Sequence, residues 1–507
     1  MSRRLILVLA LALMIGVTCA YAEVQNVKVS GDIQVQGILR SSLALQDNPA
    51  NTGTAATGGV TVQDYGENLA AILSQTRVRV DADLTDNVST SVRLINERVW
   101  GQEIGDEDAL EDDSTRIALD LAYVTLKEFL YSPLTLTVGR QELRFGNGLI
   151  IGDVDTNNRA AGHNTLGGTD NNVLPNSIDD LSLRKSFDAI RATLNYDPVV
   201  ADLVYAMIDE NSVVRKDDVD LYGINVGYTV DKNIFTEGYF WQRHRQSDST
   251  GTNPTNALVD PVGNSKTEIL NVIGVRGAYT GIERLSLQFE GAFQWGDHVT
   301  NDSIYANDYG VIGNEGIREH FKQVRAWAMQ FLADYQLPIY EKYMPMIGLH
   351  YTFLSGEDYA SNDEKYFGWD PMFEDQMGGT LINKIFGQTN ASLITLTGSM
   401  KPMEDVSLKV DAHYFLFNES MPEGGAPLDG DVGTVILTNY PGDPHYWADS
   451  QNKEAGTEID VTLKYDYTED VQFGLMGGAF IPGRAFTAGT RSAKTASQVI
   501  GSMKVSF

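Results

Sequence analysis

The chain has 507 residues with 38 basic and 68 acidic side chains, a formal net charge of −30. This excess of acidic residues argues against nucleic acid as a partner, because phosphate neutralisation needs clustered lysines and arginines. The mean hydropathy is −0.20, and past the N-terminal region no uncharged apolar run reaches the ~20 residues of a membrane helix. If the chain spans a membrane, it must do so as a β-barrel, in which every second residue is polar.

The first 22 residues have the pattern of a secretory signal peptide. Arg3 and Arg4 precede an apolar run over residues 5–17, and an A-x-A cleavage pattern ends at Ala22. Cleavage there would leave residues 23–507 as a single domain with 36 basic and 68 acidic residues, a net charge of −32. The one cysteine, Cys19, lies within the signal, so we expect no disulfide framework in the exported protein.

Segments of alternating polar and apolar residues recur along the whole chain. In residues 458–467, for example, Ile459, Val461 and Leu463 alternate with charged or hydroxyl side chains. A period of two predicts a strand with one apolar and one polar face. There are about eighteen such segments, each near the ~10 residues that cross a bilayer at a tilt. Their centres are residues 34, 77, 93, 120, 138, 189, 204, 225, 239, 273, 289, 328, 349, 396, 411, 462, 475 and 501. The predicted fold class is therefore all-β, a transmembrane antiparallel β-barrel.

Short and long connections alternate between these segments. The short ones are turn sequences at residues 85–87, 196–198, 230–233, 280–283, 401–405 and 468–470. The long ones cover residues 41–67, 101–113, 146–179, 246–266, 297–320, 356–388 and 418–453. Short periplasmic turns and long extracellular loops are typical of outer-membrane barrels. By length, we expect the loops 146–179 and 356–388 to fold inward and narrow the pore.

The last eleven residues predict a closing strand. Val499, Met503 and Val505 fall on one face, and the chain ends on the aromatic residue Phe507. The final strand of an outer-membrane barrel faces lipid on one side and the lumen on the other. We expect this strand to pair with the first one, around residues 31–39.

The polar face of the predicted strands would line the lumen, and it carries many cations. The candidate pore-lining, anion-binding residues are Arg77, Arg79, Arg93, Arg140, Arg144, Arg191 and Lys409, and Arg116 and Lys464 share their parity. Arg140 and Arg144 follow a slip in the alternation after Val138, where a bulge would turn them inward. Fixed cations lower the barrier to an anion in a narrow pore. Asp81, Glu97 and Asp120 lie beside them, so a charge ladder that only braces the wall is the competing interpretation.

The sequence shows no catalytic or cofactor motif. It contains no His-Glu-x-x-His, no Walker loop and no Gly-x-Ser-x-Gly pattern, and His244, His350 and His413 lie on separate predicted strands. The acidic segment 103–113 lacks the Asp-x-Asp-x-Asp-Gly spacing of a defined Ca²⁺ site, which favours a solvated loop over a calcium site. We therefore expect neither enzymatic activity nor a cofactor or structural metal.

Several segments resemble the alginate-export family of outer-membrane channels. They are residues 77–87, 92–100, 122–124, 136–143, 187–191, 355–358 and 369–373, and the Gly-Arg-Gln element at 139–141 is the most specific. The resemblance implies a monomeric, eighteen-stranded barrel whose lumenal arginines and lysines conduct a uronate polymer outward. It would place Arg77, Arg79, Arg93, Arg140 and Arg191 in the anion path. It also implies contact with outer-membrane lipid and lipopolysaccharide, and with periplasmic export components.

These observations together predict a passive channel in the outer membrane of a Gram-negative-type envelope. Its solute would be an anionic or polar saccharide, selected by the lumenal arginine cluster. A general diffusion porin is the nearest alternative. An outer-membrane enzyme and a secreted polysaccharide-binding β-protein are weaker alternatives, because the sequence shows neither a Ser/His/acid constellation nor a propeller repeat of ~40–50 residues.

Overall fold

The computed structural model describes residues 26–43, 45, 68–101, 117–154, 178–209, 219–246, 267–301, 319–358, 365–376, 378–420, 452–486 and 493–507. The predicted signal peptide, the acidic segment 103–113 and Arg116 lie outside these residues. Among the helices of the described part, none has the length and apolar character needed to cross a bilayer.

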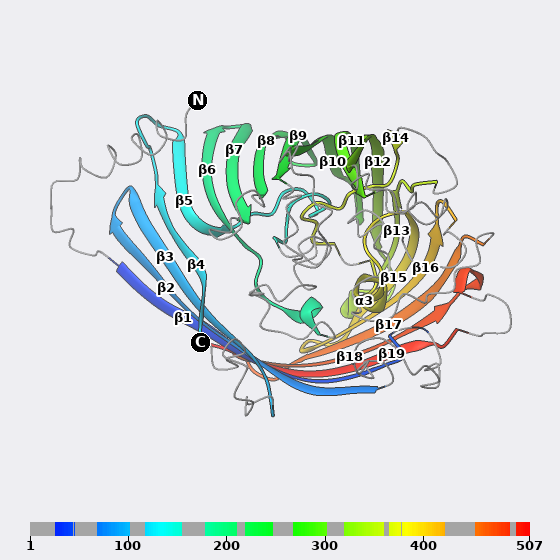
Figure 1. Cartoon of the computed structure of the whole chain (residues 1–507). Helices are drawn as coiled ribbons and strands as arrows, with labels where there is room; N and C mark the ends of the chain where they lie inside the picture. Colours follow the sequence, from blue (N-terminus) through cyan, green and yellow to red (C-terminus); the bar gives the residue numbers. More distant parts are fainter. Residues whose placement is uncertain are drawn as a thin grey trace, which may run out of the picture.

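The described chain forms one closed antiparallel barrel (Figure 1). Its eighteen wall strands are β1 (Asn26–Ser41), β2 (Asn68–Thr85), β3 (Val88–Val99), β4 (Ala118–Leu126), β5 (Leu134–Glu142), β6 (Ser186–Tyr196), β7 (Val199–Asp209), β8 (Val219–Asp231), β9 (Ile234–Gln246), β10 (Thr267–Ile282), β11 (Leu285–Asn301), β12 (Glu319–Gln336), β13 (Met346–Leu354), β15 (Ala391–Met403), β16 (Val406–Phe417), β17 (Glu454–Asp466), β18 (Val471–Pro482) and β19 (Ala496–Ser506). Each predicted strand centre falls within a different one of these strands, which confirms the eighteen-stranded barrel.

Shorter elements complete the described fold. The two-residue strand β14 (Lys365–Tyr366) pairs parallel to β12, beyond the end of the β12–β13 ladder. The alternation could not reveal a strand this short, because it is less than one full period. The helical turns are η1 (Asp179–Leu181), α3 (Thr380–Ile385), η2 (Glu341–Tyr343) and η4 (Arg484–Phe486).

The barrel closes through its first and last strands, as the sequence predicts. β1 and β19 pair from Asp32↔Ser506 to Ser41↔Ser497. The terminal residue takes part in the closure: Gly31 N donates to Phe507 O at 2.8 Å, and Phe507 N donates to Gly31 O at 2.9 Å. No sheet edge is left open along this seam, so its backbone groups need no partner from lipid.

Exposure is inverted relative to a water-soluble sheet. On β17, Ile459 and Val461 are 47% and 42% exposed, whereas Glu458 and Asp460 are 0% and 2% exposed. The apolar parity thus faces outward, where a membrane barrel contacts lipid. The polar parity faces the lumen, which contains water. Five hairpins have two-residue turns (86–87, 197–198, 232–233, 283–284 and 404–405) on the side opposite the long loops.

Candidate pore and its charged walls

Two chain segments lie inside the barrel and narrow its lumen. One is residues 143–154, which follow β5. The other comprises residues 365–376 and 378–390, which precede β15 and include α3; we call it the strap. Phe373 N donates to Ile150 O at 3.0 Å, and Asp375 N donates to Gly148 O at 2.8 Å. Figure 1 shows α3 and the neighbouring loop segments within the ring of strands. Both loops predicted to fold inward therefore have described residues in the lumen.

The strap is anchored to the β9–β11 side of the wall by buried polar groups. Arg243 on β9 contacts the Asp370 carboxylate at 2.5 and 3.0 Å and Glu268 on β10 at 3.0 Å. Gln294 on β11 donates to the Asp370 carbonyl at 2.6 Å and accepts from its amide at 2.9 Å. Burial alone would raise the pKa of Asp370, but the Arg243 guanidinium and the Met372 amide hold it below its ordinary value.

A second anchor joins α3 to the β17 side of the wall. The Glu458 carboxylate accepts hydrogen bonds from the backbone amides of Thr380, Leu381 and Ile382, each at 2.7 Å. These are amides of the first turn, which have no partner within the helix. Behind α3, the Phe386 ring packs at 5.1 Å from Phe415 and 5.4 Å from Phe480. The strap is therefore fixed at two opposite sides of the barrel.

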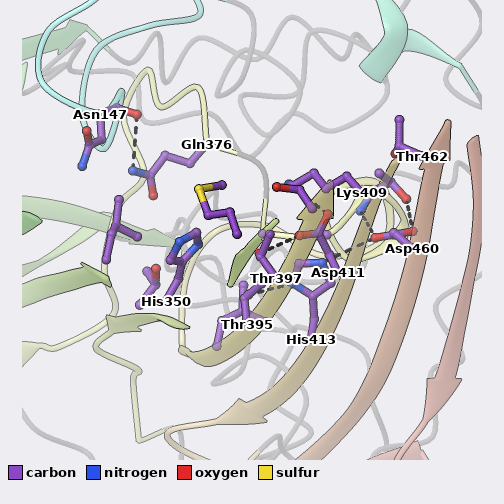
Figure 2. A pocket seen from close by; sticks show the side chains of 18 of the residues that line it. Asn147, His350, Gln376, Thr395, Thr397, Lys409, Asp411, His413, Asp460 and Thr462 are labelled. Carbon is purple, nitrogen blue, oxygen red and sulfur yellow. Dashed lines mark hydrogen bonds and ion pairs between the residues drawn. The ribbon is translucent and has the colours of Figure 1, made fainter. Parts of the chain in front are cut away.

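A cavity of about 1240 Å³ lies between the inner segments and the β12–β17 side of the wall. Figure 2 shows its labelled side chains, which come from neighbouring strands and from the two inner segments. Strand register stacks the wall residues in layers. His350, Thr395 and His413 are paired across β13, β15 and β16. The neighbouring row of inward-facing residues along the strands includes Thr397, Asp411 and Asp460. Polar residues of β13, β15, β16 and β17 thus lie side by side on the cavity wall.

Hydrogen bonds fix much of this polar surface in place. Thr395 Oγ1 lies 2.7 Å from His413 Nδ1, and Thr397 Oγ1 donates to Asp411 Oδ1 at 2.7 Å. His413 Nε2 lies 3.5 Å from Asp460. These side chains are buried and mutually satisfied, so they shape the cavity wall rather than offer free donors to a solute.

The cavity has its own group of cations, Lys401, Lys409 and Lys464 on β15, β16 and β17, which we call the lysine wall. Lys409 is 52% exposed and lies 2.9 Å from Asp411. Lys401 and Lys464 are exposed, and neither forms an ion pair with any described residue. Exposed, uncompensated ammonium groups lining a cavity attract anions into it.

The predicted arginines on β2, β3 and β6 form a different surface, the arginine wall: Arg77, Arg79, Arg93 and Arg191. All four pair with carboxylates. Arg77 contacts Asp32 at 2.5 Å, Arg79 contacts Asp81 at 2.8 Å, Arg93 contacts Asp120 at 2.5 Å and Glu142 as well, and Arg191 contacts Asp202 at 2.7 Å. Within the described chain, none of them lines the cavity beside the lysine wall.

The two remaining predicted arginines lie apart from the arginine wall. Arg140 contacts Asp188 at 3.1 Å, and in the β5–β6 register it shares the parity of Val138 and Ile190, which are exposed on the outer face. Arg144 belongs to the inner segment, lines the cavity and pairs with Asp375 of the strap. Lys409, the last predicted site residue, lines the cavity from the wall.

Sequence reasoning missed other cavity residues for identifiable reasons. Lys401 was placed in a short turn over 401–405, whereas β15 runs to Met403 and the turn is 404–405. Lys185, Asn147 and Gln376 come from loops, where no alternation indicates which way a side chain points. In the described residues, no cluster of three or more His, Cys, Asp or Glu could hold a metal ion. The acidic segment 103–113 lies outside these residues, so its interpretation as a solvated loop without calcium stays a prediction.

A closed, even-stranded barrel with an apolar outer face and a charged internal cavity defines an outer-membrane β-barrel channel. The alginate export family model matches residues 63–499, and the chain belongs to this family. No curated protein matches the chain. Among solved structures, OccAB1 of Acinetobacter baumannii has a TM-score of 0.51 at 10% identity, covering 96% of this chain and 99% of that one. OccK8 (OprE) of Pseudomonas aeruginosa has a TM-score of 0.49 at 10% identity over 96% and 99%. At such identity, the likeness to OccAB1 concerns the fold alone.

Proposed function

We propose that this channel conducts anionic or polar saccharides passively, through the cavity between the strap and the lysine wall. The observation that supports the proposal is the pair of exposed ammonium groups, Lys401 and Lys464, which have no described ion-pair partner in a cavity that also has amide and hydroxyl side chains in its lining. Cations attract an anionic solute, while amides and hydroxyls exchange hydrogen bonds with sugar hydroxyls as it moves. No chemical step is part of this function, so the protein is not an enzyme.

Within this proposal the predicted cations divide into two roles. Arg144 and Lys409 line the cavity and belong to the anion path. Arg77, Arg79, Arg93 and Arg191 pair with carboxylates, and their main role is to neutralise and brace the wall. Arg140 pairs with Asp188 on the outward-facing parity, so we place it outside the path. The protein works as a monomer surrounded by outer-membrane lipid and lipopolysaccharide, and export components in the periplasm deliver or receive its solute.

Liposome swelling tests this function. Purified protein in liposomes is exposed to glucuronate and, separately, to uncharged glucose, and the swelling rates are compared. We expect the triple variant Lys401→Gln, Lys409→Gln, Lys464→Gln to slow glucuronate entry several-fold more than glucose entry. A matched control removes three turn lysines outside the lumen, Lys127→Gln, Lys232→Gln and Lys342→Gln, and should leave both rates unchanged. Equal entry of both sugars in the wild type and the lysine-wall variant would instead indicate a general diffusion porin.

A further inference from the structure

In the middle of the strap, two cations share one carboxylate. Asp375 Oδ2 pairs with Arg144 Nη1, and Asp375 Oδ1 pairs with Lys185 Nζ. The two cations come from opposite ends of the β5–β6 connection, Arg144 just after β5 and Lys185 just before β6. Each carboxylate oxygen therefore has its own cation, and all three side chains line the cavity.

This contact differs from the two strap anchors in its access to water. Arg243 and Asp370 in the anchor on β9 are 5% and 11% exposed. Arg144 and Lys185 are 50% and 36% exposed, and Asp375 is 19% exposed. Ion pairs with this degree of exposure are weak and easily exchanged, whereas buried ones are costly to break. The strap thus has two buried anchors and, between them, an exchangeable side-chain ion pair that faces the solute space.

Amide side chains lie beside this ion pair, and Arg144 Nη2 donates to the Asn147 carbonyl at 3.1 Å. Asn147 Nδ2 donates to Gln330 Oε1 at 3.0 Å, and Gln330 Nε2 donates to Gln376 Oε1 at 2.9 Å. Figure 2 shows Asn147 and Gln376 facing each other across the cavity edge, where Gln376 Nε2 donates to the Asn147 carbonyl at 3.4 Å. Primary amides both donate and accept, so they can bind sugar hydroxyls next to a bound carboxylate.

We propose that Arg144 and Lys185 form a binding site for the carboxylate of a sugar acid, which Asp375 occupies until a solute displaces it. An incoming carboxylate offers the same two oxygens to the same two cations, and its hydroxyls exchange hydrogen bonds with Asn147 and Gln376. The Asp375 carboxylate is then released into water, while the strap backbone keeps its hydrogen bonds to Gly148 and Ile150. Asp153, whose carboxylate lies 3.8 Å from Lys185, stays as a weaker partner of that lysine. The inference rests on the proposed channel function and names the site at which that channel selects its solute.

Single-channel recording in planar bilayers tests the site, with sodium glucuronate as the blocking solute and glucose as the neutral control. Asp375→Asn removes the internal competitor, and we expect glucuronate to block at a roughly fivefold lower concentration, since an exposed ion pair has about this effect on an equilibrium. Arg144→Gln and Lys185→Gln should each raise the blocking concentration about tenfold, because a charge-assisted contact to the solute is lost. Glucose should be unaffected in all three variants.

Asp411→Asn is the matched control, because it also removes a carboxylate beside a cavity cation, Lys409. If Asp411→Asn lowers the blocking concentration as much as Asp375→Asn does, general cavity charge explains the effect and the site is refuted. An unchanged glucuronate block in Asp375→Asn, with normal conductance, would also overturn the inference while leaving the channel intact. Absence of conductance in the wild type would overturn the channel itself, and the site with it.

Discussion

The arginine wall and the lysine wall carry the same sign of charge but differ in ion pairing, because in the described chain all four arginines pair with carboxylates and only Lys409 among the three lysines does. Arg93 is 9% exposed and its partner Asp120 is 2% exposed, so their charges are satisfied inside the protein. Lys464 is exposed to the cavity, and no described carboxylate pairs with it. A buried pair presents little net field to a passing ion, whereas an exposed single charge presents nearly all of it. Whether a cation on the lumenal face acts on a passing ion therefore depends on its burial and on its ion-pair partner, not on its position alone.

The largest effect we expect is on stability, at the arginine wall. Arg93→Leu leaves Asp120 buried without its cation and should lower the free energy of unfolding by about 3–5 kcal/mol. Thermal unfolding in detergent micelles, followed by the loss of heat-modifiable gel mobility, measures this. In the double variant Arg93→Leu, Asp120→Leu no buried charge is left unpaired, so most of the loss should be recovered. Glu142, the other partner of Arg93, is 53% exposed and can be hydrated. A single variant as stable as the wild type would show that this wall does not brace the barrel.

A smaller effect should appear in acid at the strap anchor. The pKa of Asp370 is lowered in the folded protein, so its ion pair with Arg243 stabilises the strap fully above the ordinary aspartate value near 3.9 and is lost as pH falls through the lowered one. Hydrogen exchange of the Met372 amide, which donates to Asp370 at 2.7 Å, reports the anchor. We expect steady protection from pH 8 to 5 and a loss below pH 4. Asp370→Asn should remove this acid step. An onset near pH 6 would contradict the assignment.

The smallest effect should be on the stability of the lysine wall. Lys464→Gln removes an exposed charge with no described partner, so the free energy of unfolding should change by less than about 0.5 kcal/mol. The same thermal assay measures it, beside Arg93→Leu. Destabilisation comparable to that of Arg93→Leu would mean that the lysine wall stabilises the barrel as much as the arginine wall does.

Much of the barrel could be predicted from the sequence because its determinants are local. Alternation fixes which side chains face lipid, and two-residue turns fix the register of neighbouring strands. Val499 and Met503 thus identified the closing strand. β14 escaped prediction because two residues show no period, and Lys401 was missed because the end of β15 resembles its turn.

The candidate site could be predicted far less well, because it depends on contacts between distant residues. Alternation predicts a lumenal position for Arg77, Arg79 and Arg93, but only the structure shows that each of them pairs with a carboxylate. Glu458 caps α3 from 76–78 positions away, and Asp375 meets Arg144 across 231 positions. No periodicity encodes such pairings, because loops carry no repeating orientation. The sequence shows which positions are charged, whereas only the fold shows which of these charges has an ion-pair partner.

The reversal potential in a planar bilayer under a KCl gradient shows directly whether the lysine wall, and not the arginine wall, sets the ion selectivity. We expect an anion-selective wild type and a marked shift toward cation selectivity in the triple variant Lys401→Gln, Lys409→Gln, Lys464→Gln. We expect no shift when both charges of an arginine-wall ion pair are removed, as in the double variant Arg77→Gln, Asp32→Asn. An unchanged reversal potential in the lysine-wall variant, or a large shift in the paired arginine-wall variant, would contradict this expectation.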